Sequence, residues 1–161
     1  MSVLDAQTAM RYLELLRYQD RVTSGDWARV LKTFSLFSGI SRRRLRKFAR
    51  QATFREFAPG ETIVARDVSA HSLYVILGGT ATTYGASLVR TLHIGDYFGE
   101  VGLLDCGPAA ATVVAKDEVH VMTVPRRSFL RLAQRSPAIP LTMLRDLSTR
   151  FRRLETQAAR S

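Results

Sequence analysis

Residues 95–113 hold the residue types and spacing in this chain that are best suited to binding a ligand. A Gly95-Asp96 turn leads to Gly99-Glu100, and a short apolar helix, a Gly-Pro turn and the β-branched start of a strand follow. Glycine at the start of a helix lets backbone N–H groups approach an anion closely. The Glu100 carboxylate can accept hydrogen bonds from sugar hydroxyl groups, or it can cap the first turn of its own helix.

No grouping of side chains in the sequence is typical of catalysis. No Ser/His/Asp or Cys/His arrangement and no pair of carboxylates has the spacing for nucleophilic or acid–base chemistry. His71, His93 and His120 fall in separate strand or turn contexts, and Cys106 does not complete a metal-ligand pattern with them. The sequence therefore predicts no enzyme, no metal site and no resident cofactor.

The composition is that of a soluble globular protein. The chain has 161 residues, of which 46% are hydrophobic and 24% charged, so it is one domain or one domain with an added arm. No apolar run is long enough to cross a bilayer, and the N-terminus lacks the apolar block of a signal peptide. The single cysteine cannot form an internal disulfide, which favours a reducing, cytoplasmic setting.

The net charge of +10 is unevenly distributed along the chain. Residues 41–50 carry six basic and no acidic groups, and residues 126–161 carry nine basic and two acidic groups. Residues 51–125 carry four basic and eight acidic groups. The charge therefore indicates acidic partners for the flanking segments more than an anion in the middle of the chain.

Helical spacing of apolar residues occurs in both flanking segments. The first helix is predicted over residues 5–20, and Asp26, Ser41 and Ser136 are expected to cap later helices. After Arg126 the expected buried stripe consists of three residues. These are Phe129, Leu130 and Ala133.

The C-terminal helix carries apolar residues at alternating spacings of four and three, which is a heptad pattern. The residues of this seam are Pro140, Leu144, Leu147, Phe151, Leu154 and Ala158. The seam can join two subunits in a weak homodimer or pack on its own domain, and the sequence leaves both readings open.

From Thr53 the apolar period shifts from 3.6 residues towards 2, which predicts strands. Strands are expected at residues 62–65, 73–77, 80–84, 88–94, 113–114 and 119–124, the last two pairing around a turn at Asp117-Glu118. A short helix is expected at 99–104. Many short strands at hairpin spacing, without β–α–β alternation, indicate an antiparallel barrel or double sheet.

Five phrases in this order resemble the cyclic-nucleotide-binding domain family, in which catabolite activator protein and the regulatory subunits of protein kinase A are found. They are residues 34–41 (FSLFSGIS), 59–63 (PGETI), 73–76 (LYVI) with Gly79, 95–100 (GDYFGE) and 110–113 (AATV). The resemblance implies an α+β fold: an antiparallel β-roll of the double-stranded jelly-roll type, with N-terminal helices and two C-terminal helices. The implied division is an N-terminal helical extension at 1–25, the roll with flanking helices at 26–136 and a lid or dimer helix at 137–161.

The resemblance also implies a phosphate-binding cassette for a cyclic nucleotide, cAMP or cGMP. Its residues here are Phe98, Gly99, Glu100, Val101, Ala109, Ala110, Ala111 and Thr112. The family normally has an arginine that grips the cyclic phosphate where this chain has Ala109, and Arg66 stands where a glycine is usual. Arg90 and Arg66 are candidate surrogate cations, and a surface role is the alternative for both.

The sequence thus predicts a regulatory ligand-binding module whose cassette binds a cyclic nucleotide weakly or not at all. The alternative is a nucleotide-independent module that contacts an acidic protein or nucleic acid through basic helices, or simply a solvated basic face. The residues of that basic run are Arg42, Arg43, Arg44, Arg46 and Lys47. The sequence shows no helix-turn-helix segment after the last helix, which disfavours a complete transcription regulator of this family.

Overall fold

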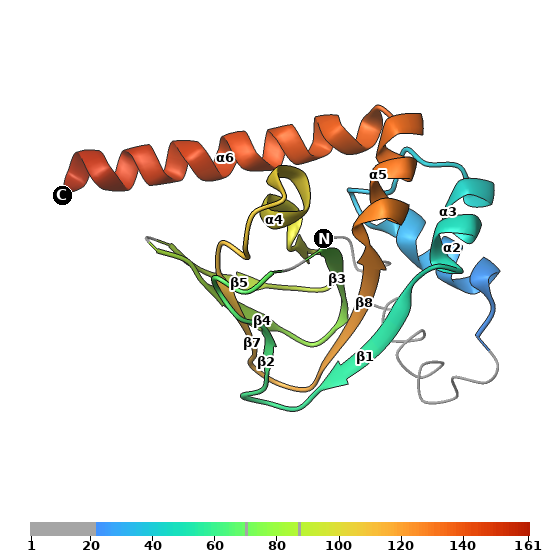
Figure 1. Cartoon of the computed structure of the whole chain (residues 1–161), viewed down its shortest axis with the longest axis horizontal. Coiled ribbons are helices and arrows are strands. Elements are labelled where there is room, and N and C mark those ends of the chain that lie inside the picture. The colour runs from blue at the N-terminus through green and yellow to red at the C-terminus, as the bar shows by residue number, and fades with distance from the viewer. Residues whose placement is uncertain (1–21, 70, 87) are drawn as a thin grey trace.

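The strand-rich middle of the chain folds into two four-stranded antiparallel sheets that face each other (Figure 1). The structure is a computed structural model that describes residues 22–69, 71–86 and 88–161. One sheet has the order β1 (Thr53–Phe57), β8 (Val119–Pro125), β3 (Ser72–Gly78), β6 (Tyr97–Phe98). The other has the order β2 (Thr62–Val64), β7 (Thr112–Ala115), β4 (Ala81–Tyr84), β5 (Val89–Leu92). The antiparallel β-roll expected from the sequence is confirmed.

The expected pairing of the last two strands is wrong, because β7 and β8 belong to different sheets. The chain changes sheet at Gly79 and again at Asp117-Glu118, and these two crossings lie against each other. The Thr80 N–H and hydroxyl donate to the Asp117 carboxylate at 2.6 and 2.7 Å. Gly79 has φ +77°, and a Cβ there would lie 2.1 Å from the Glu118 carbonyl oxygen. Two short strands, β1 and β6, are absent from the sequence prediction.

Two apolar cores hold the domain together. Alternate residues of the strands fill the roll, with Phe57, Ile76 and Val121 among those fully buried. A second core joins one face of β3 and β8 to the N-terminal helices α2 (Ser24–Thr33) and α3 (Arg42–Ala49) and to α5 (Arg126–Arg135). The helices α2, α3 and α5 therefore cover one side of the roll. A separate short helix, α4 (Glu100–Asp105), lies at one end of the roll, as Figure 1 shows.

The helix caps differ in part from the sequence prediction. Ser41 caps α3 as expected. Thr23 caps α2, and Asp26, expected to be the cap, is instead the third helical residue of a reciprocal capping box. Ser136 does not cap the last helix, because its hydroxyl is buried and accepts a hydrogen bond from Arg44. On α5 the expected stripe packs against the core, with Phe129 buried and Leu130 and Ala133 partly buried, and Leu132 is a further buried residue that was not predicted.

The last helix, α6 (Ala138–Arg160), crosses over α4 along the open end of the roll (Figure 1). Only Ile139 and Met143, in its first turns, are buried. The seam is largely exposed, with Leu144 at 59% and Phe151 at 60% of full accessibility. Within the described residues, no helix is both long and apolar enough to cross a membrane. The helix predicted at residues 5–20 lies outside the described residues.

Candidate functional site

The cassette residues converge on a small cavity at the end of the roll beneath α6. Its volume is about 70 Å³. Seven of the eight predicted cassette residues line it: Phe98, Gly99, Glu100, Val101, Ala109, Ala110 and Ala111. The eighth, Thr112, is not among them, because it starts β7 and its hydroxyl accepts a hydrogen bond from the Arg66 N–H at 3.0 Å.

Gly99 sets the entry of the chain into the cassette helix α4. Its φ is +87°, in the left-handed region that side chains rarely adopt. A Cβ there would lie 2.6 Å from the Ser72 carbonyl oxygen and 2.9 Å from the Tyr74 ring. Phe98, just before it, is buried and stacks on Tyr74 with ring centroids 5.0 Å apart. The cassette helix is therefore fixed in position by a close backbone approach to β3.

Ala109 is fixed equally firmly on the opposite wall. Its N–H donates to the Val68 carbonyl at 2.9 Å, and its own carbonyl accepts from the Asp67 N–H at 3.0 Å. The side chain is buried, with 5% of its residue surface accessible, and lines the cavity. The position that the family resemblance assigns to a cationic group thus points at the cassette but carries only a methyl group.

Glu100 is a buried carboxylate whose partner comes from α6. Its side chain is 4% exposed, and one carboxylate oxygen accepts a hydrogen bond from the Arg150 guanidinium in an ion pair. The Arg150 side chain is 20% exposed and lines the same cavity. One turn earlier on α6, the Asp146 carboxylate accepts a hydrogen bond from the Tyr97 hydroxyl at 2.6 Å. Two polar contacts one helical turn apart therefore hold α6 on the cassette.

Arg90 of β5 is the second guanidinium at the cavity. It is half-buried, and its burial lowers its pKa, as does the neighbouring Arg150 charge, while Glu100 and Asp96 act in the opposite direction. An anion placed between Arg90 and Arg150 would relieve both the desolvation and the like-charge repulsion. Of the two candidate surrogate cations, the structure brings Arg90 to the cassette. Arg66 does not line the cavity, and its Nε lies 3.8 Å from the Oδ1 of Asp67 in an ion pair.

A larger hollow adjoins the cavity on the side of α6. Its volume is about 500 Å³, within the usual range for small-molecule sites. It shares Thr83, Arg90, Ala110, Ala111 and Arg150 with the cassette cavity. Apolar side chains of α6 form its outer wall: Leu147, Phe151 and Leu154. The two hollows together offer a polar end at the cassette and an apolar end under the last helix.

The sequence model of the Cyclic nucleotide-binding domain family matches residues 54–136, more than half of the chain. The chain belongs to this family. The matched residues include all eight predicted cassette residues, and Arg150 of α6 lies outside them.

Curated relatives and a solved structure agree with this assignment. A cAMP-dependent protein kinase regulatory subunit of Debaryomyces hansenii is 32% identical over 145 residues, covering 89% of this chain and 31% of the relative. A cGMP-dependent 3',5'-cGMP phosphodiesterase A of Dictyostelium discoideum is 29% identical over 111 residues, covering 69% of this chain and 13% of the relative. The structure of PKAR CBD2 with bound Sp-2Cl-cAMPS has a TM-score of 0.71 at 25% identity and covers 80% of this chain and 86% of that chain. The chain spans about a third or less of the length of the curated relatives named here.

The cassette cavity is also lined by five residues that the sequence prediction did not include: Val64, Thr83, Gly102, Val113 and Arg150. Arg150 is the charged one among them, and no motif in the sequence marks it. The only available signal was its position on the last helix, between the seam residues Leu147 and Phe151. Which of the neighbouring arginines meets the cassette depends on the rotation of α6 about its axis, and the sequence does not determine that rotation.

One further group of metal-ligand types lies elsewhere, on β8 and its neighbours. Glu56, Glu118 and His120 have ligand atoms within 4.8 Å of one another, and the His120 Nε2 lies 3.3 Å from Glu118. No sequence pattern connects these residues, because Glu56 meets His120 only through the pairing of β1 with β8. Both carboxylates are exposed, and the group does not line the cassette cavity.

Proposed function

We propose that this chain is a non-enzymatic regulatory module whose cassette binds a cyclic nucleotide weakly and transmits its occupancy to α6. The observation that carries the proposal is the ion pair between Arg150 of α6 and the buried Glu100, beside the uncharged Ala109. The hydroxyl-binding group of the cassette is thereby held by the last helix. The proposed setting is the cytoplasm, in keeping with the single cysteine.

Weak binding has a physical reason at each end of the ligand. Loss of one partner of a desolvated charge pair costs about 2–5 kcal/mol, or on the order of thirty-fold to several thousand-fold in affinity. In this proposal a sugar hydroxyl also competes with Arg150 for the Glu100 carboxylate. The cassette cavity, at about 70 Å³, is far smaller than a ligand site of ordinary size. In this proposal the nucleotide extends from this cavity into the adjoining hollow and shifts α6 as it binds.

Two groups remain to hold a cyclic nucleotide. Arg90 supplies a positive charge beside the cassette, and the adjoining hollow offers Leu147 and Phe151 of α6 to a base. The same helix carries Arg150, whose ion pair with Glu100 competes with the sugar of the ligand for that carboxylate. The base of the ligand and the ion pair therefore both involve α6. Binding and displacement of α6 are then linked, and each changes the free energy of the other by the same amount.

Several relatives are named as regulatory subunits of cAMP-dependent protein kinases, and a kinase is the corresponding partner class to propose here. In this proposal the displaced α6 is the element that a partner protein recognises. The phosphodiesterase relative matches over only 13% of its length, so its name does not bring catalysis to this chain.

Calorimetric titration with cAMP and with cGMP tests the proposal, using the unaltered chain and Ala109→Arg. The substitution should raise affinity by about thirty-fold or more, because the rest of the cassette wall is present. Ala58→Arg is the matched control, since it adds the same charge at an exposed turn that does not line the cavity. Hydrogen exchange of the α6 backbone should increase when the nucleotide binds.

Two results would overturn the proposal. If Ala109→Arg folds normally and still binds neither nucleotide, the cassette is not a binding site and the nucleotide-independent module is favoured. If nucleotide binds with the exchange of α6 unchanged, the module binds ligand but does not pass the signal through this helix.

A further inference from the structure

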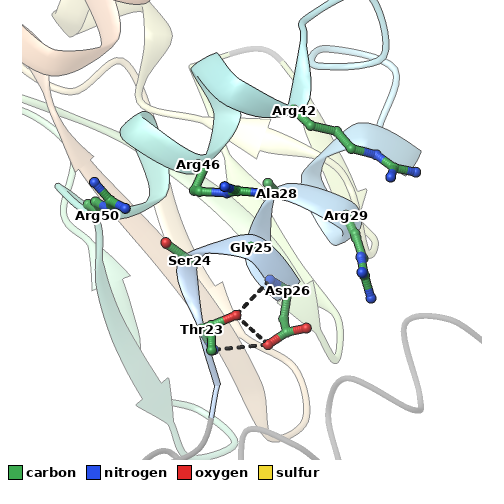
Figure 2. A pocket seen from close by; sticks show the side chains of 9 residues that line it. All are labelled: Thr23, Ser24, Gly25, Asp26, Ala28, Arg29, Arg42, Arg46 and Arg50. Carbon is green, nitrogen blue, oxygen red and sulfur yellow. Dashed lines mark hydrogen bonds between the residues drawn. The ribbon is translucent and has the colours of Figure 1, made fainter.

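A second hollow, unrelated to the cassette, lies between the first turn of α2 and one face of α3. Its volume is about 420 Å³. Figure 2 shows Arg46 reaching from α3 towards the start of α2, with Arg42 and Arg50 before and after it on α3 and Arg29 on α2. A Cβ built on Gly25 would lie 3.8 Å from the Arg46 Nε, so this guanidinium rests over the first turn of α2. Four arginines thus border one concavity.

The hollow has a large excess of positive charge. Among the described residues, Asp26 is the one carboxylate that lines it, and that group is engaged by the Thr23 hydroxyl at 2.6 Å and the Thr23 N–H at 3.0 Å (Figure 2). Those two hydrogen bonds lower the pKa of Asp26, so it stays ionised at neutral pH. Among the described residues, none forms an ion pair or hydrogen bond with the side chains of the four arginines.

The charge repulsion in this arrangement is unfavourable for α3, although Arg46 lies in the last turn, where a basic residue is favourable. Arg42, Arg46 and Arg50 are four residues apart, and like charges at that spacing repel each other on a helix. Arg42 also lies at the positive end of the α3 dipole, and the first turn of α3 has no acidic residue. Local features that disfavour the fold occur most often at functional sites, where a bound group offsets them.

We propose that this hollow is a binding site for a compact anion with two or more linked phosphate groups. Guanidinium groups bind phosphate oxygens through paired, charge-assisted hydrogen bonds, and four of them match the charge of a di- or triphosphate. The volume is that of a small-molecule site. The site is independent of the cyclic-nucleotide proposal, since it shares no residue with the cassette cavity.

An extended nucleic-acid surface fits the same region less well. The basic run of the sequence is divided by the fold. Arg44 and Lys47 line a different hollow, and the Arg44 guanidinium is bound to the Arg135 carbonyl at 2.6 Å. Only two of the five residues of the run, Arg42 and Arg46, therefore line the α2 hollow, which limits the contact to a compact group.

Calorimetry and thermal unfolding of the full chain with inorganic tripolyphosphate test the proposal. Tripolyphosphate should bind saturably and raise Tm. Arg46→Gln should weaken binding by about tenfold to a hundredfold, the effect of losing one hydrogen-bonding charged partner. Arg42→Gln should weaken it in the same direction. Arg43→Gln, on the same helix but not lining the hollow, is the matched control and should change affinity by less than about twofold.

The outcomes are distinct from those of the cassette experiment. Saturating cAMP should leave tripolyphosphate affinity unchanged, and competition between them would place the phosphate at the cassette and overturn the inference. Absence of saturable binding, or equal losses in Arg46→Gln and Arg43→Gln, would also overturn it. Tighter binding of a single-stranded oligonucleotide that depends equally on Arg43 and Arg46 would indicate an extended nucleic-acid surface instead.

Discussion

Replacing Arg150 with glutamine should destabilise the domain, because it leaves the Glu100 carboxylate buried without its charged partner. Removal of one member of a fully buried ion pair costs about 3–5 kcal/mol. Glu100 is almost fully buried, but the Arg150 side chain is 20% exposed and glutamine keeps a neutral donor. We therefore expect a loss of about 2–3 kcal/mol in the free energy of unfolding.

Urea unfolding followed by circular dichroism gives this loss directly, and thermal unfolding gives it independently. At about 2–4 °C of Tm per kcal/mol for a domain of this size, the expected drop in Tm is about 4–12 °C. Arg153→Gln is the matched control. It removes the same charge from the same helix, but Arg153 forms no ion pair with any of the described residues. Its effect should stay within about 0.5 kcal/mol.

A double-mutant cycle with Glu100→Gln separates the ion pair from other effects of the substitution. Once Glu100 is neutral, Arg150→Gln no longer leaves a buried charge without a partner. The double variant should therefore lose less unfolding free energy than the sum of the losses of the two single variants. We expect a coupling energy of about 2 kcal/mol. If Arg150→Gln costs no more than Arg153→Gln, or if the cycle shows no coupling, the ion pair does not hold α6 on the cassette.

Two further predictions follow from the backbone of the cassette and from the exposed face of α6. Gly99→Ala should cost more than about 3 kcal/mol in unfolding free energy, because strain at φ +87° adds to a 2.6 Å contact with Ser72. Gly60→Ala, at φ +85° with no atom within 4 Å, should cost about 1–2 kcal/mol, and equal losses would contradict the steric argument. The exposed seam should form a weak dimer that high salt strengthens, since residues 126–161 carry nine basic and two acidic groups. Sedimentation of the chain and of Leu147→Glu at low and high salt measures this, and a monomer throughout would leave α6 as a lid alone.

Local sequence signals were sufficient for the short helix after Gly99 and for most elements of the fold. Glycine at position 99, followed by a carboxylate and an apolar turn, predicts a short helix, and α4 begins at Glu100. Alternation in the strands also predicts the roll, because one face of each strand must be buried. The same signals failed where pairing depends on distant segments. The alternation of apolar and polar residues in 113–124 predicts two strands but does not predict which strands they pair with. They belong to different sheets, because the chain crosses between the sheets at Asp117, beside the crossing at Gly79.

Charged residues were harder to place, because period and propensity do not say what a long flexible side chain reaches. Arg66 and Arg90 both lie on or beside short strands, yet only Arg90 faces the cassette. The run at 42–47 appeared to be one basic face, and the fold divides it between two hollows. In each case the deciding quantity is the rotation or register of an element relative to a neighbour far away in the sequence.

The placement of Ala109 and Arg150 has a consequence for how such a module would respond to a ligand. A cation at position 109 belongs to the loop that contacts the ligand, and it raises affinity whether α6 is docked or displaced. Arg150 belongs to α6, so its charge is at the cassette only while that helix is docked. If the proposal holds, the missing cation at 109 lowers affinity in every state of α6, whereas the Arg150–Glu100 ion pair opposes the ligand only while α6 is docked. Restoring arginine at 109 should then tighten binding by about the same factor with arginine or glutamine at position 150, which titration of the double variant Ala109→Arg, Arg150→Gln would measure.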